Sequence, residues 1–268
     1  SYNRLNQYLH LISNTSSPTP LDIWVPSGPY IKPQKLDQFA LGYYTKVKEV
    51  KLESEVFYKK IKNRLDYIDG ADLVANDNIE TVILPGISRA YGMELLLRKN
   101  SGRHKYWIAY TLSKSEQKTP GRNSNENGIN MSKWYNTPYD KTHDFSINSE
   151  YNINKKLKIV GNFIFQTGQP TNYPNSQYNY MNLNVPNYGE RNSQRLPNYH
   201  RLDINLTLTP NRNDKKIESS WVFGIYNIYD RDNASSIIFR RNNETLKNEA
   251  VQISIFGIVP SVTYNFKF

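Results

Sequence analysis

The chain has 268 residues, no cysteine and a formal net charge of +10 at pH 7. Lysine and arginine are spread along it without a basic run, so the charge does not indicate a nucleic-acid-binding protein. The longest candidate for a transmembrane helix, Ile253 to Val262, is shorter than the roughly 18 apolar residues required and contains Gly257 and Pro260. Aromatic residues make up 13% of the chain, which is typical of proteins that cross a membrane with β-strands.

Alternation of apolar and polar residues with a period of two predicts strands along most of the chain. Ten strands are expected, in the order Ser1–Ser13, Leu36–Val47, Leu52–Asp66, Ser88–Asn100, His104–Glu116, Lys141–Ile153, Leu157–Gln169, Tyr199–Pro210, Ile217–Arg240 and Ala250–Phe268. The first segment has no apolar core of a signal peptide, so we expect a mature chain or a fragment.

The connections between these strands alternate between short and long. Short turns are predicted at residues 48–51, 101–103, 154–156 and 211–216, and long loops near residues 14–35, 67–87, 117–140, 170–198 and 241–249. Outer-membrane barrels have short periplasmic turns and long extracellular loops. The pattern therefore predicts an all-β protein, an antiparallel transmembrane β-barrel wall in the cell outer membrane, with its C-terminus in the periplasm.

In such a barrel the apolar row of each strand faces lipid and the polar row faces the lumen. We expect Leu202, Ile204, Leu206 and Leu208 to face lipid, and Asp203, Asn205, Thr207 and Thr209 to face the lumen, together with Glu53, Glu55, Glu94, Arg98, Asp144 and Glu150. The last two strands exceed the 9–11 residues that cross a bilayer, so they should project beyond it. Gly257 and Pro260 lie where the alternation changes phase, which suggests a bulge.

Four segments resemble the end of a TonB-dependent outer-membrane receptor. Arg195–Asp203 resembles the entry to that family's third-last strand, and Gly224–Arg231 its penultimate strand. Arg89–Leu95 resembles a mid-barrel strand of the family, and Tyr264–Phe268 its C-terminal ending. The order and spacing of these segments cover nearly the whole chain.

The resemblance implies that residues 1–268 form the C-terminal portion of the barrel, the last ten of twenty-two strands, without the plug domain. It implies a component of a receptor for energised uptake of a scarce nutrient ligand, with no cofactor. The implied partners are membrane lipid, the remainder of the receptor, an energising TonB-type inner-membrane complex acting through the plug, and the barrel-assembly machinery. That machinery would recognise Tyr264, Phe266 and Phe268. Whether a surface lipoprotein covers the loops is left open.

Ligand contacts are expected from aromatic and arginine side chains of the outer loops. Aromatic rings supply large rigid surfaces, and arginine grips carboxylate or phosphate groups with two bonds. The candidates are Trp24, Tyr30, Arg122, Trp134, Tyr135, Tyr173, Tyr178, Tyr180, Tyr188, Arg191 and Arg195. The alternative for the aromatic residues is that they pack the long loops against one another.

Neither a catalytic site nor a metal site is expected. His143 and Asp144 are adjacent, so in a strand they point to opposite faces, and the same holds for His200 and Asp203. Asp66, Asp69, Asp72 and Asp77 surround Gly70, but their spacing does not match a calcium-binding EF-hand loop, and a solvated loop is the preferred interpretation.

Two other functional classes fit the pattern. The first is a free-standing ten-stranded outer-membrane barrel that acts as an adhesin, a passive pore or a rim protease. The second is a soluble β-rich binding domain, because soluble sheets also alternate. Dependence on detergent separates the soluble domain from both membrane proteins.

Overall fold

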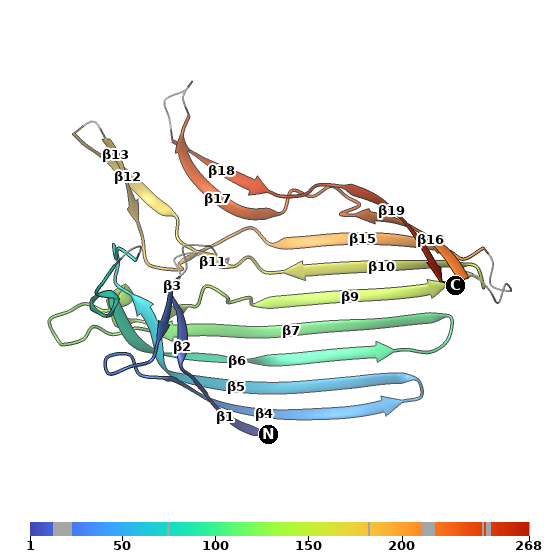
Figure 1. Ribbon diagram of the computed structural model, residues 1–268, viewed down its shortest axis with the longest axis horizontal. Helices are drawn as coiled ribbons and strands as arrows, with labels where there is room; N and C mark the ends of the chain where they lie inside the picture. The colour runs from blue at the N-terminus through green and yellow to red at the C-terminus, as the bar shows by residue number, and fades with distance from the viewer. Residues whose placement is uncertain are drawn as a thin grey trace.

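The computed structural model describes residues 1–12, 23–73, 76–181, 183–210, 218–242, 244 and 248–267. Its main element is one antiparallel sheet in which ten strands follow the order β1-β4-β5-β6-β7-β9-β10-β15-β16-β19 (Figure 1). These strands are β1 (Tyr2–Gln7), β4 (Gln34–Val47), β5 (Val50–Tyr67), β6 (Ile83–Lys99), β7 (His104–Lys118), β9 (His143–Asn152), β10 (Leu157–Gln166), β15 (Tyr199–Leu208), β16 (Glu218–Tyr226) and β19 (Val259–Lys267). The predicted all-β class and the neighbour-to-neighbour strand order are confirmed.

The two ends of the sheet differ, as the loop lengths predict. Tight turns join β4 to β5 at Lys48 and Glu49, β6 to β7 through residues 100–103, and β9 to β10 through residues 153–156. Lys48 has φ 55° and Gly102 φ 81°, the left-handed conformation that such short connections use. These turns and the C-terminal end of the chain lie at the right of Figure 1, and the long loops lie at the left.

The long connections contain short strands and turns of 3-10 helix in addition to loop. The elements are β2 (Leu9–Ile12), β3 (Ile23–Pro26), η1 (Ile79–Thr81), η2 (Ile129–Ser132), β8 (Tyr135–Asn136), β11 (Pro170–Thr171), β12 (Pro174–Tyr180), β13 (Leu183–Tyr188), β14 (Gln194–Arg195), β17 (Ala234–Arg241) and β18 (Asn248–Ser254). The pairs β2–β3, β11–β14, β12–β13 and β17–β18 form separate two-stranded sheets, while β8 adds to β7.

The first predicted strand, Ser1–Ser13, is divided in the structure. Its first part is β1, which pairs with β4, whereas β2 pairs with β3 outside the main sheet. Ile12 and Val25 of this hairpin are buried against Ile83 of β6. Burial of these apolar side chains over the sheet explains why the segment leaves it.

The last two predicted strands are also divided. A turn closed by Asn227 interrupts the first, because its side chain bonds both the backbone N–H and the carbonyl of Arg231. The second is interrupted between β18 and β19, where the Ile258 N–H donates to Asp230 Oδ1 at 2.6 Å. A Cβ on Gly257 would lie 2.4 Å from the same oxygen, so a larger residue here would displace the Asp230 carboxylate from this hydrogen bond. The predicted bulge is thus a break between strands, and Pro260 lies within β19.

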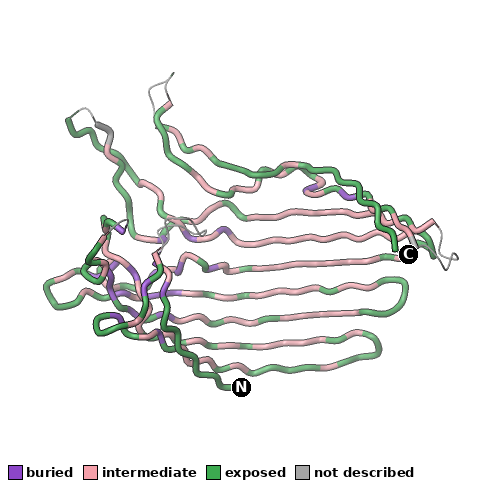
Figure 2. Tube along the Cα trace, viewed as in Figure 1, coloured by how far each residue is buried: buried purple, intermediate pink, exposed green. Residues whose placement is uncertain are grey.

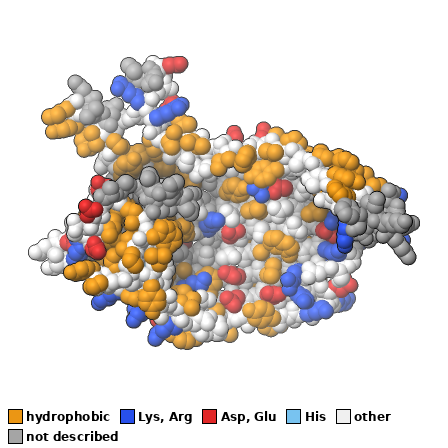
Figure 3. Space-filling view, in the orientation of Figure 1, with side chains coloured by type: hydrophobic (Ala, Val, Ile, Leu, Met, Phe, Trp, Pro, Cys, Tyr) orange, Lys and Arg blue, Asp and Glu red, His pale blue; other side chains and the backbone are white. Residues whose placement is uncertain are grey.

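The register separates an apolar from a polar face of the sheet. Leu206 pairs with Ile159, which in turn pairs with Tyr151, whereas Asp203 pairs with Asn162 on the opposite face. The polar face carries ion pairs between neighbouring strands, namely Glu53–Arg98, Glu150–Lys105 and Glu150–Lys158, and the pair Arg201–Asp203 within β15. Figure 3 shows acidic and basic side chains over the middle of the visible face. The rows predicted from the alternation are therefore the rows of the structure.

The buried core lies among the loops rather than along the sheet (Figure 2). One cluster contains Ile12, Val25, Ile31, Leu73 and Ile83, and a second contains Leu84, Ile129 and Tyr135. Both clusters pack the loops on the same ends of β5, β6 and β7. In the part of the chain that the structure describes, no helix is long and apolar enough to cross a membrane. Within the same part, β1 pairs only with β4 and β19 only with β16.

Candidate functional site

A polar network lies at the loop end of the sheet, centred on Asp66, the penultimate residue of β5. Asp66 Oδ1 accepts hydrogen bonds from the Tyr67 N–H at 2.8 Å and from Arg191 Nη1 at 2.5 Å. Asp66 Oδ2 accepts from Gln117 Nε2 at 2.6 Å and from the Tyr135 hydroxyl at 2.5 Å. The carboxylate therefore joins three chain segments that are remote in sequence. The expectation that this aspartate lies in a solvated loop is wrong, because Asp66 is buried.

Arg191 enters this network from the loop that follows β13. Its side chain is only 9% exposed, it also donates to Asp69, and its guanidinium lies 4.4 Å from the centre of the Tyr67 ring. Burial lowers the pKa of Arg191, but the negative charges of Asp66 and Asp69 help to outweigh it, and the pKa of Arg191 is raised. The guanidinium is thus a charged anchor that holds this loop over β5.

The hydrogen-bond directions around Gln117 follow from its partners. Burial and the charge of Asp66 raise the pKa of Tyr135, so its hydroxyl stays protonated and donates to the carboxylate. The Gln117 amide nitrogen donates to Asp66 and to the Tyr135 oxygen at 2.9 Å, which uses both of its hydrogens. Gln117 is 3% exposed, and its Oε1 has no partner among the described residues.

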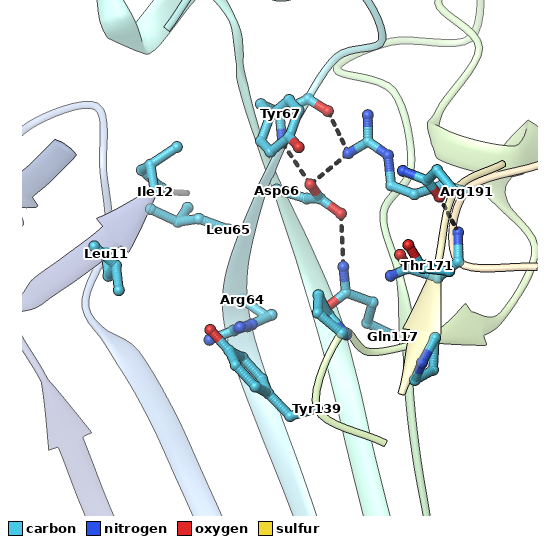
Figure 4. A pocket seen from close by; sticks show the side chains of 14 residues that line it. Leu11, Ile12, Arg64, Leu65, Asp66, Tyr67, Gln117, Tyr139, Thr171 and Arg191 are labelled. Carbon is cyan, nitrogen blue, oxygen red and sulfur yellow. Dashed lines mark hydrogen bonds and ion pairs between the residues drawn. The ribbon is translucent and has the colours of Figure 1, made fainter. Parts of the chain in front are cut away.

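A cavity of about 220 Å³ adjoins this network (Figure 4). The charged residues that line it are Arg64, Asp66 and Arg191, two cations and one anion, which leaves a net charge of +1. Gln117 and Tyr139 also line it, and Figure 4 shows Arg64 and Tyr139 together on one side of the space. Sequence analysis did not identify this cavity.

The other two nominated arginines also hold loops together. Arg195 pairs with the fully buried Asp140 and donates to the Gly168 carbonyl at 2.9 Å. Arg122 pairs with Glu126 at 2.6 Å and donates to backbone carbonyls of residues 81 and 83. Intrachain contacts therefore occupy all three nominated arginines, and their role as ligand contacts stays a prediction.

The nominated aromatic residues fall into two groups. Trp134 stacks 4.2 Å from the Arg89 guanidinium, Tyr135 is buried in the network, and Tyr173 contacts Phe239 of β17 at 5.4 Å between ring centres. The other group is at least half exposed and consists of Trp24, Tyr30, Tyr178, Tyr180 and Tyr188. The last three lie on the β12–β13 hairpin, and this group presents the most open aromatic surface among the nominated residues that the structure describes.

His143, which is adjacent to Asp144, and His200, three residues before Asp203, bond to tyrosines instead of aspartates. His143 Nδ1 lies 2.9 Å from the Tyr110 hydroxyl, and His200 Nδ1 lies 2.8 Å from the Tyr229 hydroxyl. Among the residues that the structure describes, no group of three histidine or acidic side chains could hold a metal ion.

The proposed assembly signal is partly visible. Tyr264 packs on Trp221 of β16 with ring centres 4.6 Å apart, and on Phe266 at 5.8 Å. These three rings lie on the apolar face of the sheet. Phe268 lies outside the described residues, so the role of this terminus stays a prediction.

Comparison with known proteins identifies the fold. No family model matches the chain, and neither does any curated protein. Among solved structures, the ferric-catecholate import receptor Fiu of Escherichia coli K12 in its closed form matches 99% of this chain, with 17% identity and a TM-score of 0.59. The fold is that of the barrel part of TonB-dependent outer-membrane receptors.

Two further receptors give the same result. The ferripyoverdine receptor of Pseudomonas aeruginosa matches 88% of the chain with 10% identity and a TM-score of 0.56. The ferric citrate transporter FecA matches 88% with 15% identity and a TM-score of 0.50. The chain spans only 32%, 27% and 31% of the lengths of Fiu, the ferripyoverdine receptor and FecA. It therefore corresponds to about a third of such a receptor.

Proposed function

We propose that this chain forms part of the barrel wall and outer loops of an outer-membrane receptor that takes up a scarce nutrient in an energy-dependent way. The observation that carries the proposal is the difference between the two ends of the sheet. One end has tight turns, whereas the other has long loops that pack into a buried core around Asp66. A wall with one elaborated end suits capture of a ligand at the cell surface.

The proposal assigns the chain an orientation. The apolar row containing Leu206 meets lipid, and the polar row containing Asp203 faces the lumen, because charges on the lipid face are costly. The loop end is then extracellular, with the loops near residues 14–35, 67–87, 117–140, 170–198 and 241–249. The short turns and the C-terminus are periplasmic, and residues 1–268 are the C-terminal portion of the barrel.

The proposed partners follow from this placement. The polar face, with its ion pairs, would meet a plug domain. The outer strands β1 and β19 would meet the rest of the barrel. In a barrel that contains the chain, further strands would satisfy the backbone groups of both outer strands, since lipid cannot. An energising TonB-type complex would act through the plug, and the assembly machinery on the terminal strand.

Energy dependence separates this receptor from a passive pore. The gene that encodes the chain is deleted, the mutant is screened for lost growth on limiting ferric chelates, vitamins and glycans, and uptake of the identified nutrient is measured with and without a protonophore. We expect uptake in the complemented strain to stop when the proton gradient collapses. Uptake that persists at the same rate without the gradient would overturn the proposal in favour of a pore.

A further inference from the structure

The cavity beside Asp66 combines an unpaired cation with an unpaired hydrogen-bond acceptor. Arg64 has no hydrogen bond or ion pair with any described residue. The nearby His10 adds no second positive charge, because burial and the charge of Arg64 lower the His10 pKa. Asp66 does not pair with Arg64, because its oxygens already accept hydrogen bonds from Arg191, Gln117, Tyr135 and the Tyr67 N–H. The charge of Arg64 is therefore available to an anion.

The acceptor is Gln117 Oε1, which is buried and has no partner among the described residues. Its orientation is fixed, because the amide nitrogen must donate to the Asp66 carboxylate, so the amide cannot turn without placing two acceptors together. A buried carbonyl oxygen without a donor is unfavourable. A bound hydroxyl or N–H group would satisfy it.

We propose that this cavity binds the carboxylate end of a ligand that carries a hydroxyl or N–H group next to the carboxylate. Arg64 pairs with the carboxylate, Gln117 Oε1 accepts from the adjacent donor, and the Tyr139 hydroxyl, which no described residue engages, completes the site. At about 220 Å³ the cavity is smaller than the roughly 300–1,000 Å³ of sites for drug-sized ligands. It suits a hydroxy acid or the terminal residue of a larger ligand.

This inference deepens the proposed function and depends on it for its biological setting. The binding itself is measured in detergent, without an energised membrane. Binding without gradient-dependent uptake would refute the proposed function and leave this site in place. Gradient-dependent uptake without binding of these probes would refute only the site.

Four small probes separate the required groups, each titrated against the full-length purified protein by ligand-observed NMR. Lactate has a carboxylate and a hydroxyl, N-acetylalanine a carboxylate and an N–H, propionate only the carboxylate, and lactamide an amide in place of the carboxylate. For such small fragments we expect dissociation constants on the order of millimolar. Lactate or N-acetylalanine should bind about tenfold more tightly than propionate, because a site built around a hydrogen bond discriminates against ligands that cannot form it. Tighter binding of lactate would identify the ligand as a hydroxy acid, and tighter binding of N-acetylalanine would identify it as the carboxyl end of a peptide.

Arg64→Gln should weaken binding of lactate, N-acetylalanine and propionate by about tenfold, since it removes a charge-assisted pair without removing bulk. Lys62→Gln is the matched control, because it removes the same charge from an exposed residue outside the cavity. Gln117→Met would also remove two donors from the Asp66 network, so the propionate comparison tests Gln117 instead. Equal binding of lactate, propionate and lactamide, or unchanged binding in Arg64→Gln, would overturn the proposal.

Discussion

Replacement of Asp66 by asparagine should loosen the loops at one end of the sheet. Asparagine has the same shape, but it removes the charge beside Arg191 and turns one acceptor toward Gln117 and Tyr135 into a donor. Breaking a buried ion pair costs about 3–5 kcal/mol. Asp69 still contacts Arg191, so the lower end, about 3 kcal/mol, is expected.

Hydrogen exchange measures this change locally. Because 1.4 kcal/mol corresponds to a factor of ten, a loss of about 3 kcal/mol should speed exchange of loop amides around residues 188–193 by about a hundredfold. The matched control is Asp69→Asn, since the Asp69 side chain is 75% exposed and its pair should contribute less than about 1 kcal/mol. The reasoning is wrong if the two variants exchange at the same rate, or if Asp66→Asn leaves the loop amides protected.

Three further outcomes are expected. Leu206→Arg should impair insertion by about 2–4 kcal/mol while Thr207→Arg does not, as measured by heat-modifiable mobility, and equal tolerance would contradict the assignment of the faces. Deletion of Phe268 should slow assembly into outer-membrane vesicles more than it lowers stability, and insertion at the normal rate would exclude a recognition role. Burial and the charge of Arg64 lower the pKa of His10 in the folded β2–β3 hairpin, so the unfolded hairpin binds a proton more readily. Protection of that hairpin against hydrogen exchange should therefore fall as the pH drops below about 6.5, the ordinary histidine pKa. His10→Gln should abolish this pH dependence. Protection that does not change with pH in the unmodified chain would contradict the prediction.

The sequence was sufficient to predict the sheet. Alternation is a property of consecutive residues, because successive side chains of a strand point to opposite faces. The row that contains Leu206 and the row that contains Asp203 could therefore be assigned before their neighbours were known. Loop lengths also come directly from the chain, which is why the short turns after β4, β6 and β9 alternate with long loops as predicted. The fourth predicted turn, at residues 211–216, lies outside the described residues.

Only the tertiary structure decided where strands end and which polar residues are buried. The predicted strand Ile217–Arg240 runs through Asn227, but a turn there interrupts the strand, and the Asn227 side chain binds the backbone of Arg231. Asp66 looked like a solvated loop residue because its partners, Gln117, Tyr135 and Arg191, are separated from it by 51, 69 and 125 residues. Local pattern determines the face on which a side chain lies, whereas burial depends on which remote segments pack over that face. The sequence by itself therefore determined the wall, and the folded loops determined the cavity between Arg64 and Gln117.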